Sequence, residues 1–120
     1  MSTSIAQAFL NRNDDKITDP VVVHIILSLM KNISDDKSDK LAIKFLDKID
    51  FGNDLEQTLN FYGEMRANFG HLEKIIVTLI YKAAGLIIKA RKINKGRITN
   101  KLLSFMQASL AFCYITVPVL

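Results

Sequence analysis

Apolar residues recur at intervals of three or four along most of the chain, the spacing that places side chains on one face of an α-helix. The clearest helix start is Asp19-Pro20, because Asp can cap a helix and Pro fits its first position. Residues 5–12 predict the end of an earlier helix. A polar link follows over 32–39, in which Ser34 or Ser38 can cap the next helix. That third helix would end at Phe51-Gly52. The expected apolar faces of the second and third helices are Val22, Ile25, Ile26, Leu29 and Ile33, and Leu41, Ala42, Phe45, Leu46 and Ile49.

The second half of the chain predicts three more helices. Asn53 or Asp54 can cap a fourth helix, which would stop at Gly70. The fifth is the longest and is apolar on more than one face, which predicts burial on both sides, with Gly85 allowing close helix contact. Residues 94–96 break it, and Thr99 or Asn100 would start the sixth. The expected faces are Leu55, Leu59, Tyr62, Met65 and Phe69 for the fourth helix, and Leu72, Ile76, Leu79, Ala83, Leu86, Ala90 and Ile93, widened by Ile75, Val77, Ile80 and Ile87, for the fifth.

This order of helices and short links predicts an all-α fold of antiparallel helix pairs. Only two Pro and five Gly interrupt 120 residues, which favours helices over a turn-rich β fold. A central helix covered on both faces is typical of a HEAT-like α-solenoid, so we expect residues 1–120 to form a single solenoid segment of about six helices. A closed bundle of four to six helices is the alternative.

The last nineteen residues, 102–120, contain no charge. This length is close to the ~20 apolar residues that span a bilayer, so one interpretation is a tail-anchored membrane protein. The other is a packed helix, which we favour because Ser104, Gln107 and Ser109 suit packing better than lipid. An end this apolar also predicts that the chain is a piece of a longer protein.

Charge is divided unevenly along the chain. Residues 1–73 carry eight Lys and Arg against twelve Asp and Glu, a net −4, whereas residues 74–120 carry eight cations and no acid, a net +8. A solvated helix end favoured by the helix dipole would explain the densest cluster, and we prefer that interpretation because no aromatic residue lies among the charges. The alternative is an interaction patch for anionic lipid, nucleic acid or an acidic protein surface, formed by Lys89, Arg91, Lys92, Lys95, Arg97 and Lys101.

No catalytic, metal or cofactor site is expected. His24 and His71 stand in no metal-binding pattern, and a single cysteine, Cys113, cannot form a zinc cluster or an internal disulfide. The lone cysteine indicates a reducing compartment. No Gly-rich phosphate loop is present, because Gly96 stands alone in a turn. We therefore interpret the chain as non-enzymatic.

One string carries more information than the composition. Residues 51–62 read Phe-Gly-Asn-Asp-Leu-Glu-Gln-Thr-Leu-Asn-Phe-Tyr, followed by Glu64 and Arg66. This stretch resembles the large subunit of the retriever complex, a paralogue of the large vacuolar-protein-sorting subunit of retromer. The similarity includes Asp19-Pro20-Val21, resumes at Asn68-Phe69 and Leu72-Glu73, and runs through Lys95-Gly96. It ends in Ile-Thr-Val-Pro over 115–118 and in Leu120, so it covers nearly the whole chain.

The resemblance implies a piece of the C-terminal half of an α-solenoid. That half holds a small subunit with a metallophosphoesterase fold, in machinery that returns membrane proteins from endosomes to the cell surface. The implied role is a non-enzymatic scaffold segment that supports this transport through protein–protein contacts, in the cytoplasm and peripheral to endosomes. Nucleic acid is not an expected partner.

Overall fold

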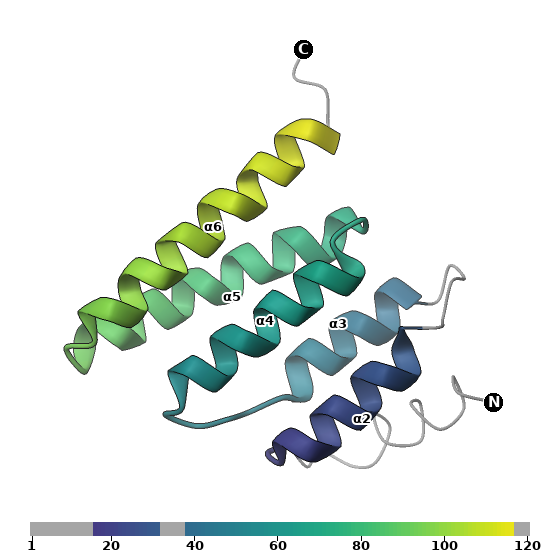
Figure 1. Cartoon of the computed structure of the whole chain (residues 1–120), viewed down its shortest axis with the longest axis horizontal. Helices are drawn as coiled ribbons and strands as arrows, with labels where there is room; N and C mark the ends of the chain where they lie inside the picture. The colour runs from purple at the N-terminus through teal and green to yellow at the C-terminus, as the bar shows by residue number, and fades with distance from the viewer. Residues whose placement is uncertain (1–15, 32–37, 117–120) are drawn as a thin grey trace. The chain divides into compact units, whose positions relative to one another are not determined.

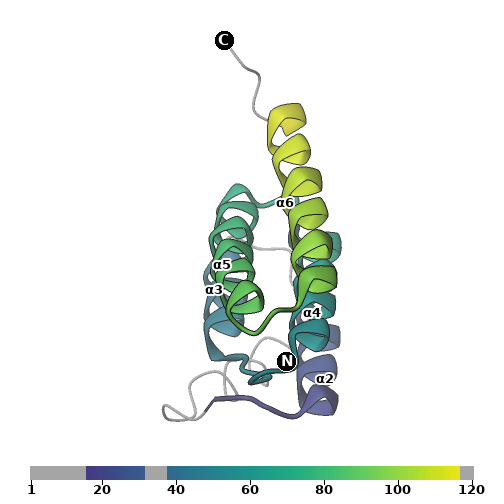
Figure 2. The ribbon, with the colours of Figure 1, turned by 90° about the vertical axis from the view of Figure 1, so that its left-hand side faces the viewer.

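Residues 16–31 and 38–116 are described by a computed structural model, and their regular elements are five α-helices. Figures 1 and 2 show these helices from two directions. The all-α prediction is confirmed, whereas the expected helix over 5–12 lies outside the described residues. The chain separates into two compact units, Met1–Asn53 and Asp54–Leu120. The helices are α2 (Pro20–Met30), α3 (Ser38–Lys48), α4 (Leu55–Phe69), α5 (Glu73–Lys92) and α6 (Gly96–Thr116).

Helix α2 begins where the sequence predicts. The Asp19 side chain accepts a hydrogen bond from the Val21 N–H at 2.9 Å, and Pro20 is the first helical residue. The buried face differs from the predicted one, however: Ile25, which the spacing assigns to the apolar face, is half exposed. Every residue from Val21 to Leu27 except His24 is apolar, so spacing alone does not select the buried face. The buried residues are Val23, Ile26, Leu27 and Met30.

Helix α3 buries Leu41, Ala42, Phe45 and Leu46, as predicted. Its end is tied to the segment before α2 by backbone pairing that the sequence pattern did not indicate. The Ile17 N–H donates to the Lys48 carbonyl at 2.8 Å, and the Asp50 N–H donates back to the Ile17 carbonyl at 3.0 Å. The turn that follows places Gly52 at φ +61°, a left-handed conformation that glycine adopts without steric cost.

Helix α4 is capped by Asp54, whose carboxylate accepts from the Gln57 N–H at 3.1 Å. Leu55, Tyr62, Met65 and Phe69 are buried as predicted, and the structure adds Phe61 to this set. Gly70 ends the helix without a left-handed turn. It is needed for space, because a Cβ there would collide with the Arg66 carbonyl oxygen.

The link between α5 and α6 is a three-residue turn, 93–95, so α6 starts at Gly96 rather than at Thr99 or Asn100. Asn94 adopts φ 58°. Its N–H donates to the Arg91 carbonyl at 3.2 Å, and the Lys95 N–H donates to the Ala90 carbonyl at 2.8 Å. These are the two bonds of a Schellman motif, which satisfies the last carbonyls of α5 and lets α6 begin immediately.

Helices α4, α5 and α6 pack together in the second unit. Figure 1 shows α5 and α6 side by side and running in opposite directions, which confirms the predicted antiparallel pair. In Figure 2, α5 lies on one side, and α4 and α6 lie on the other. The unit's core comprises Leu55, Phe61, Tyr62, Met65, Phe69, Ile75, Ile76, Leu79, Ala83, Ile87, Ala90, Ile98, Leu102 and Phe105. Packed neighbouring helices of this kind are consistent with a piece of a helical solenoid.

Candidate functional site

The six basic residues of the predicted patch are divided among the end of α5, the link that follows it and the first turns of α6. Lys89, Arg91 and Lys92 occupy the last turn of α5, and Lys95 lies in the link. Arg97 and Lys101, one helical turn apart on α6, instead line an open groove between α6 and α4. The structure therefore divides the patch into a set at the end of α5 and a pair on the groove.

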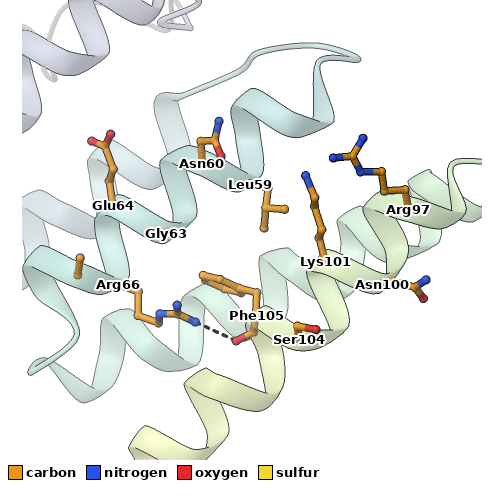
Figure 3. A pocket seen from close by; sticks show the side chains of 11 residues that line it. Leu59, Asn60, Gly63, Glu64, Arg66, Arg97, Asn100, Lys101, Ser104 and Phe105 are labelled. Carbon is orange, nitrogen blue, oxygen red and sulfur yellow. Dashed lines mark hydrogen bonds between the residues drawn. The ribbon is translucent and has the colours of Figure 1, made fainter.

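The groove between α4 and α6, shown in Figure 3, has a volume of about 1160 Å³. Each helix contributes residues spaced by three or four, which places them on one helical face. The groove is open to solvent, so it presents a surface between two helices rather than an enclosed small-molecule pocket. Its lining is Leu59, Asn60, Gly63, Glu64, Arg66 and Ala67 from α4, and Arg97, Asn100, Lys101, Ser104 and Phe105 from α6.

Arg66 and Phe105 join the two walls of the groove. The Arg66 guanidinium lies over the Phe105 ring, with Cζ 4.5 Å from the ring centroid, and its Nη1 donates to the Phe105 carbonyl at 3.1 Å. The Ser109 hydroxyl donates to the same carbonyl at 2.9 Å. Tyr62 packs against Phe105 with ring centroids 6.4 Å apart, and its burial raises the pKa of the phenol to about 12. An aromatic floor thus supports a half-buried cation.

Positive charge dominates the groove. Arg66, Arg97 and Lys101 line it, whereas Glu64 is its single acidic residue. Lys101 forms an exposed ion pair with Glu56 at 3.4 Å. Among the described residues, neither Arg66 nor Arg97 has a carboxylate partner. Sequence reasoning missed Arg66 because it lies in the acidic part of the chain. Only the packing of α4 on α6 places it in the same groove as Arg97, toward the opposite end (Figure 3).

A second surface lies on α5, opposite the buried face of that helix. Val77, Tyr81 and Ile88 are spaced by four and seven residues, and 41%, 75% and 57% of their respective surfaces are exposed. The prediction that α5 is buried on both sides is therefore wrong for this chain. Gly85 lies beside this stripe in open space, so it permits no close helix contact here. On α6, Leu103 and Leu110 are also exposed, two turns apart.

The two histidines do not lie in buried sites, because His24 and His71 are both exposed. Across residues 16–31 and 38–116, no three His, Cys, Asp or Glu side chains come together as metal ligands. No helix within those ranges is long and apolar enough to cross a membrane. The tail-anchor hypothesis drew on residues 102–120, of which 117–120 lie outside the described part.

The fold and its surfaces define a class of protein, an all-α segment of packed helix pairs that carries an apolar stripe and a basic groove. A sequence model described as the VPS35L C-terminal domain matches residues 1–120. The chain belongs to this family.

Individual relatives agree with the family match. The chain is 34% identical to mouse VPS35 endosomal protein-sorting factor-like and 32% identical to the human protein of that name, over 95% of its length in both cases. The corresponding protein of Drosophila melanogaster is 32% identical over 92% of the chain. The chain spans only 13% of the mouse and human proteins and 12% of the fly protein.

Proposed function

We propose that this chain is a non-enzymatic scaffold segment of an endosomal sorting complex of the retriever type, built as a HEAT-like solenoid over residues 1–120. It acts through contacts between its helix faces and protein partners, and it supports transport of membrane proteins from endosomes to the plasma membrane. Its location is cytoplasmic, peripheral to endosomes. Family membership and the printed name of the relatives, endosomal protein-sorting factor-like, support this role.

The apolar stripe of α5 is the observation that carries the proposal. Val77, Tyr81 and Ile88 lie in a row along the outer face of a helix whose inner face is already buried in the unit. Apolar rows on a solvent-facing helix mark interaction sites, and solenoids bury such faces against the next layer or a partner. Gly85 beside the row would let a partner helix approach closely.

By resemblance to retriever, the partner is a small subunit with a metallophosphoesterase fold. Because a structural scaffold needs no catalytic groups of its own, the proposal assigns none to this chain. The basic residues at the end of α5, Lys89, Arg91, Lys92 and Lys95, are solvated charges near a helix C-terminus in this account.

Co-purification of the tagged chain from its native cells, with partners identified by mass spectrometry, tests the proposal. We expect endosomal sorting subunits, including the metallophosphoesterase-fold protein, and we expect Tyr81→Glu to lose them. His24→Glu is the matched control, because it places the same charge on an exposed position of α2. Recovery of the same subunits with Tyr81→Glu, or of none with the parent chain, would contradict the proposal.

A further inference from the structure

We propose that the groove between α4 and α6 binds an acidic amphipathic helix of a partner protein. The groove is open to solvent and is lined along its length by residues of two helices, α4 and α6. Recognition of a helix in a groove uses an apolar face laid on the floor and charges matched at the rim. The inference rests on the proposed scaffold role, to which it adds a second contact surface and the chemistry of its occupant.

The floor of the groove offers space for apolar side chains. Gly63 sits midway along the α4 wall, and a Cβ built on it meets nothing within 4 Å. Leu59 lies one turn before it, and Phe105 faces it from α6 (Figure 3). A glycine in a helix interior weakens that helix by about 1 kcal/mol relative to alanine. Its place at the centre of the groove is where an incoming side chain would approach the backbone.

The rim selects an acidic occupant. One Nη1–H of Arg66 donates to the Phe105 carbonyl, and because a guanidinium has five N–H donors, others remain available to a ligand. Arg66 is half-buried and lines the groove, so its guanidinium is not fully enclosed by the protein. Arg97 stands on the opposite wall with no carboxylate partner among those residues. Carboxylates on an acidic helix can pair with the guanidinium groups of Arg66 and Arg97, because a guanidinium binds a carboxylate through two parallel hydrogen bonds.

Two labelled 18-residue helical peptides test the inference by fluorescence anisotropy with the full chain. Both carry the same leucine stripe, flanked by Glu in one and by Lys in the other. We expect the Glu peptide to bind at least tenfold more tightly, and its binding to weaken as salt is raised. Equal binding of the two peptides, or no binding of either, would overturn the groove proposal. The scaffold role is judged separately, by co-purification.

Matched variants locate the binding surface. Gly63→Leu fills the groove, whereas Gly85→Leu makes the same change on the exposed face of α5. Both replace a helical glycine in open space, so both are expected to fold. We expect Gly63→Leu and Arg97→Glu to weaken binding of the Glu peptide at least fivefold. Gly85→Leu and Arg91→Glu should leave its affinity unchanged. The reverse pattern would place binding elsewhere and overturn the inference.

Competition distinguishes a protein ligand from the other anionic partners of a basic surface. A 20-nucleotide single-stranded RNA and phosphatidylserine vesicles are added to the complex with the Glu peptide. We expect neither to displace the peptide at equal charge concentration. If the RNA or the vesicles displace the peptide, and Gly63→Leu also weakens binding of that competitor, the groove is a site for nucleic acid or lipid and the proposal fails.

Discussion

The Arg66 guanidinium stacks on the Phe105 ring, 4.5 Å from Cζ to centroid, while donating a hydrogen bond to the carbonyl of the same residue. One side chain of α4 thus contacts both the ring and the backbone of α6. Cation–π contact and a charge-assisted hydrogen bond each contribute about 1 kcal/mol or more when partly desolvated. This pair therefore fixes the spacing of the two groove walls.

Arg66→Met should destabilise the chain by about 1–2 kcal/mol. Methionine keeps most of the packing of the aliphatic part of the arginine side chain, but it removes the charge and the N–H group that donates to the Phe105 carbonyl. Urea denaturation followed by circular dichroism measures the change. Arg97→Met is the control, since Arg97 is exposed and should change stability by less than about 0.5 kcal/mol. Equal effects of the two substitutions would show that the Arg66–Phe105 contact contributes no stability.

Two glycines should respond in opposite ways to alanine. Gly70→Ala places a Cβ against the Arg66 carbonyl and should destabilise the chain by at least about 1 kcal/mol, because backbone must move. Gly85→Ala meets open space inside α5 and should stabilise it by up to about 1 kcal/mol. Thermal melts of the two variants beside the parent measure both shifts, and a shift of the same sign in both would be inconsistent with the two environments.

Asn94 should tolerate glycine and resist β-branched residues. Its φ of 58° holds the Schellman turn between α5 and α6, and this region is strained for valine. Asn94→Val should therefore cost about 1–2 kcal/mol of unfolding free energy, while Asn94→Gly should be neutral or stabilising. Denaturant midpoints measured for both variants test this, and an unaffected Asn94→Val would mean that the turn is not held in the left-handed conformation.

Ala83 is fully buried on the inner face of α5. Ala83→Asp would place an unpaired carboxylate in the packed interior and should cost several kcal/mol. Ala84→Asp, its half-buried neighbour, is the control and should cost markedly less. Melting temperatures would reveal the difference, and a variant at position 83 that melts within a degree or two of the parent would show that this packing is misassigned.

Tyr62 should make the chain less stable at high pH. Burial raises its pKa from 10.0 to about 12, so the folded state holds the phenolic proton more tightly than the unfolded state. This stabilising contribution is fully present well below pH 10 and is lost as the pH rises toward 12, by about 1.4 kcal/mol at pH 11. Tyr62→Phe should remove that part of the pH dependence, which parallel urea titrations at pH 9 and 11 can measure.

Helix positions were predictable from sequence because capping groups and apolar spacing act locally. Asp19, Asp54 and Gly70 mark helix ends as expected, and Ala83 lies on the predicted buried face. The start of α6 was misplaced because Asn94 adopts a left-handed conformation that allows a three-residue turn. Apolar spacing can identify a second face on a helix, but it cannot show whether another element covers that face.

The candidate surfaces were less predictable than the helices. Local charge density pointed to the cluster around the α5–α6 turn, yet the groove depends on Arg66. This residue lies 31 residues before Arg97 and shares the groove with it only because α4 packs on α6. The outer face of α5 was visible as an apolar pattern, but Tyr81 was not among the residues assigned to it. Tertiary packing assembles the groove, whereas the stripe lies on the single helix α5 and tertiary packing decides only that it stays exposed.

Co-localisation of two folded variants with an endosomal marker tests the central claim most directly. The double variant Tyr81→Glu, Ile88→Glu disrupts the α5 stripe, whereas the triple variant Arg91→Gln, Lys92→Gln, Lys95→Gln removes cations outside the groove. If protein contacts through helix faces place the chain on endosomes, the double variant should disperse and the triple variant should remain. Dispersal of the triple variant together with retention of the double variant would contradict a scaffold held by protein partners and indicate direct binding to anionic lipid.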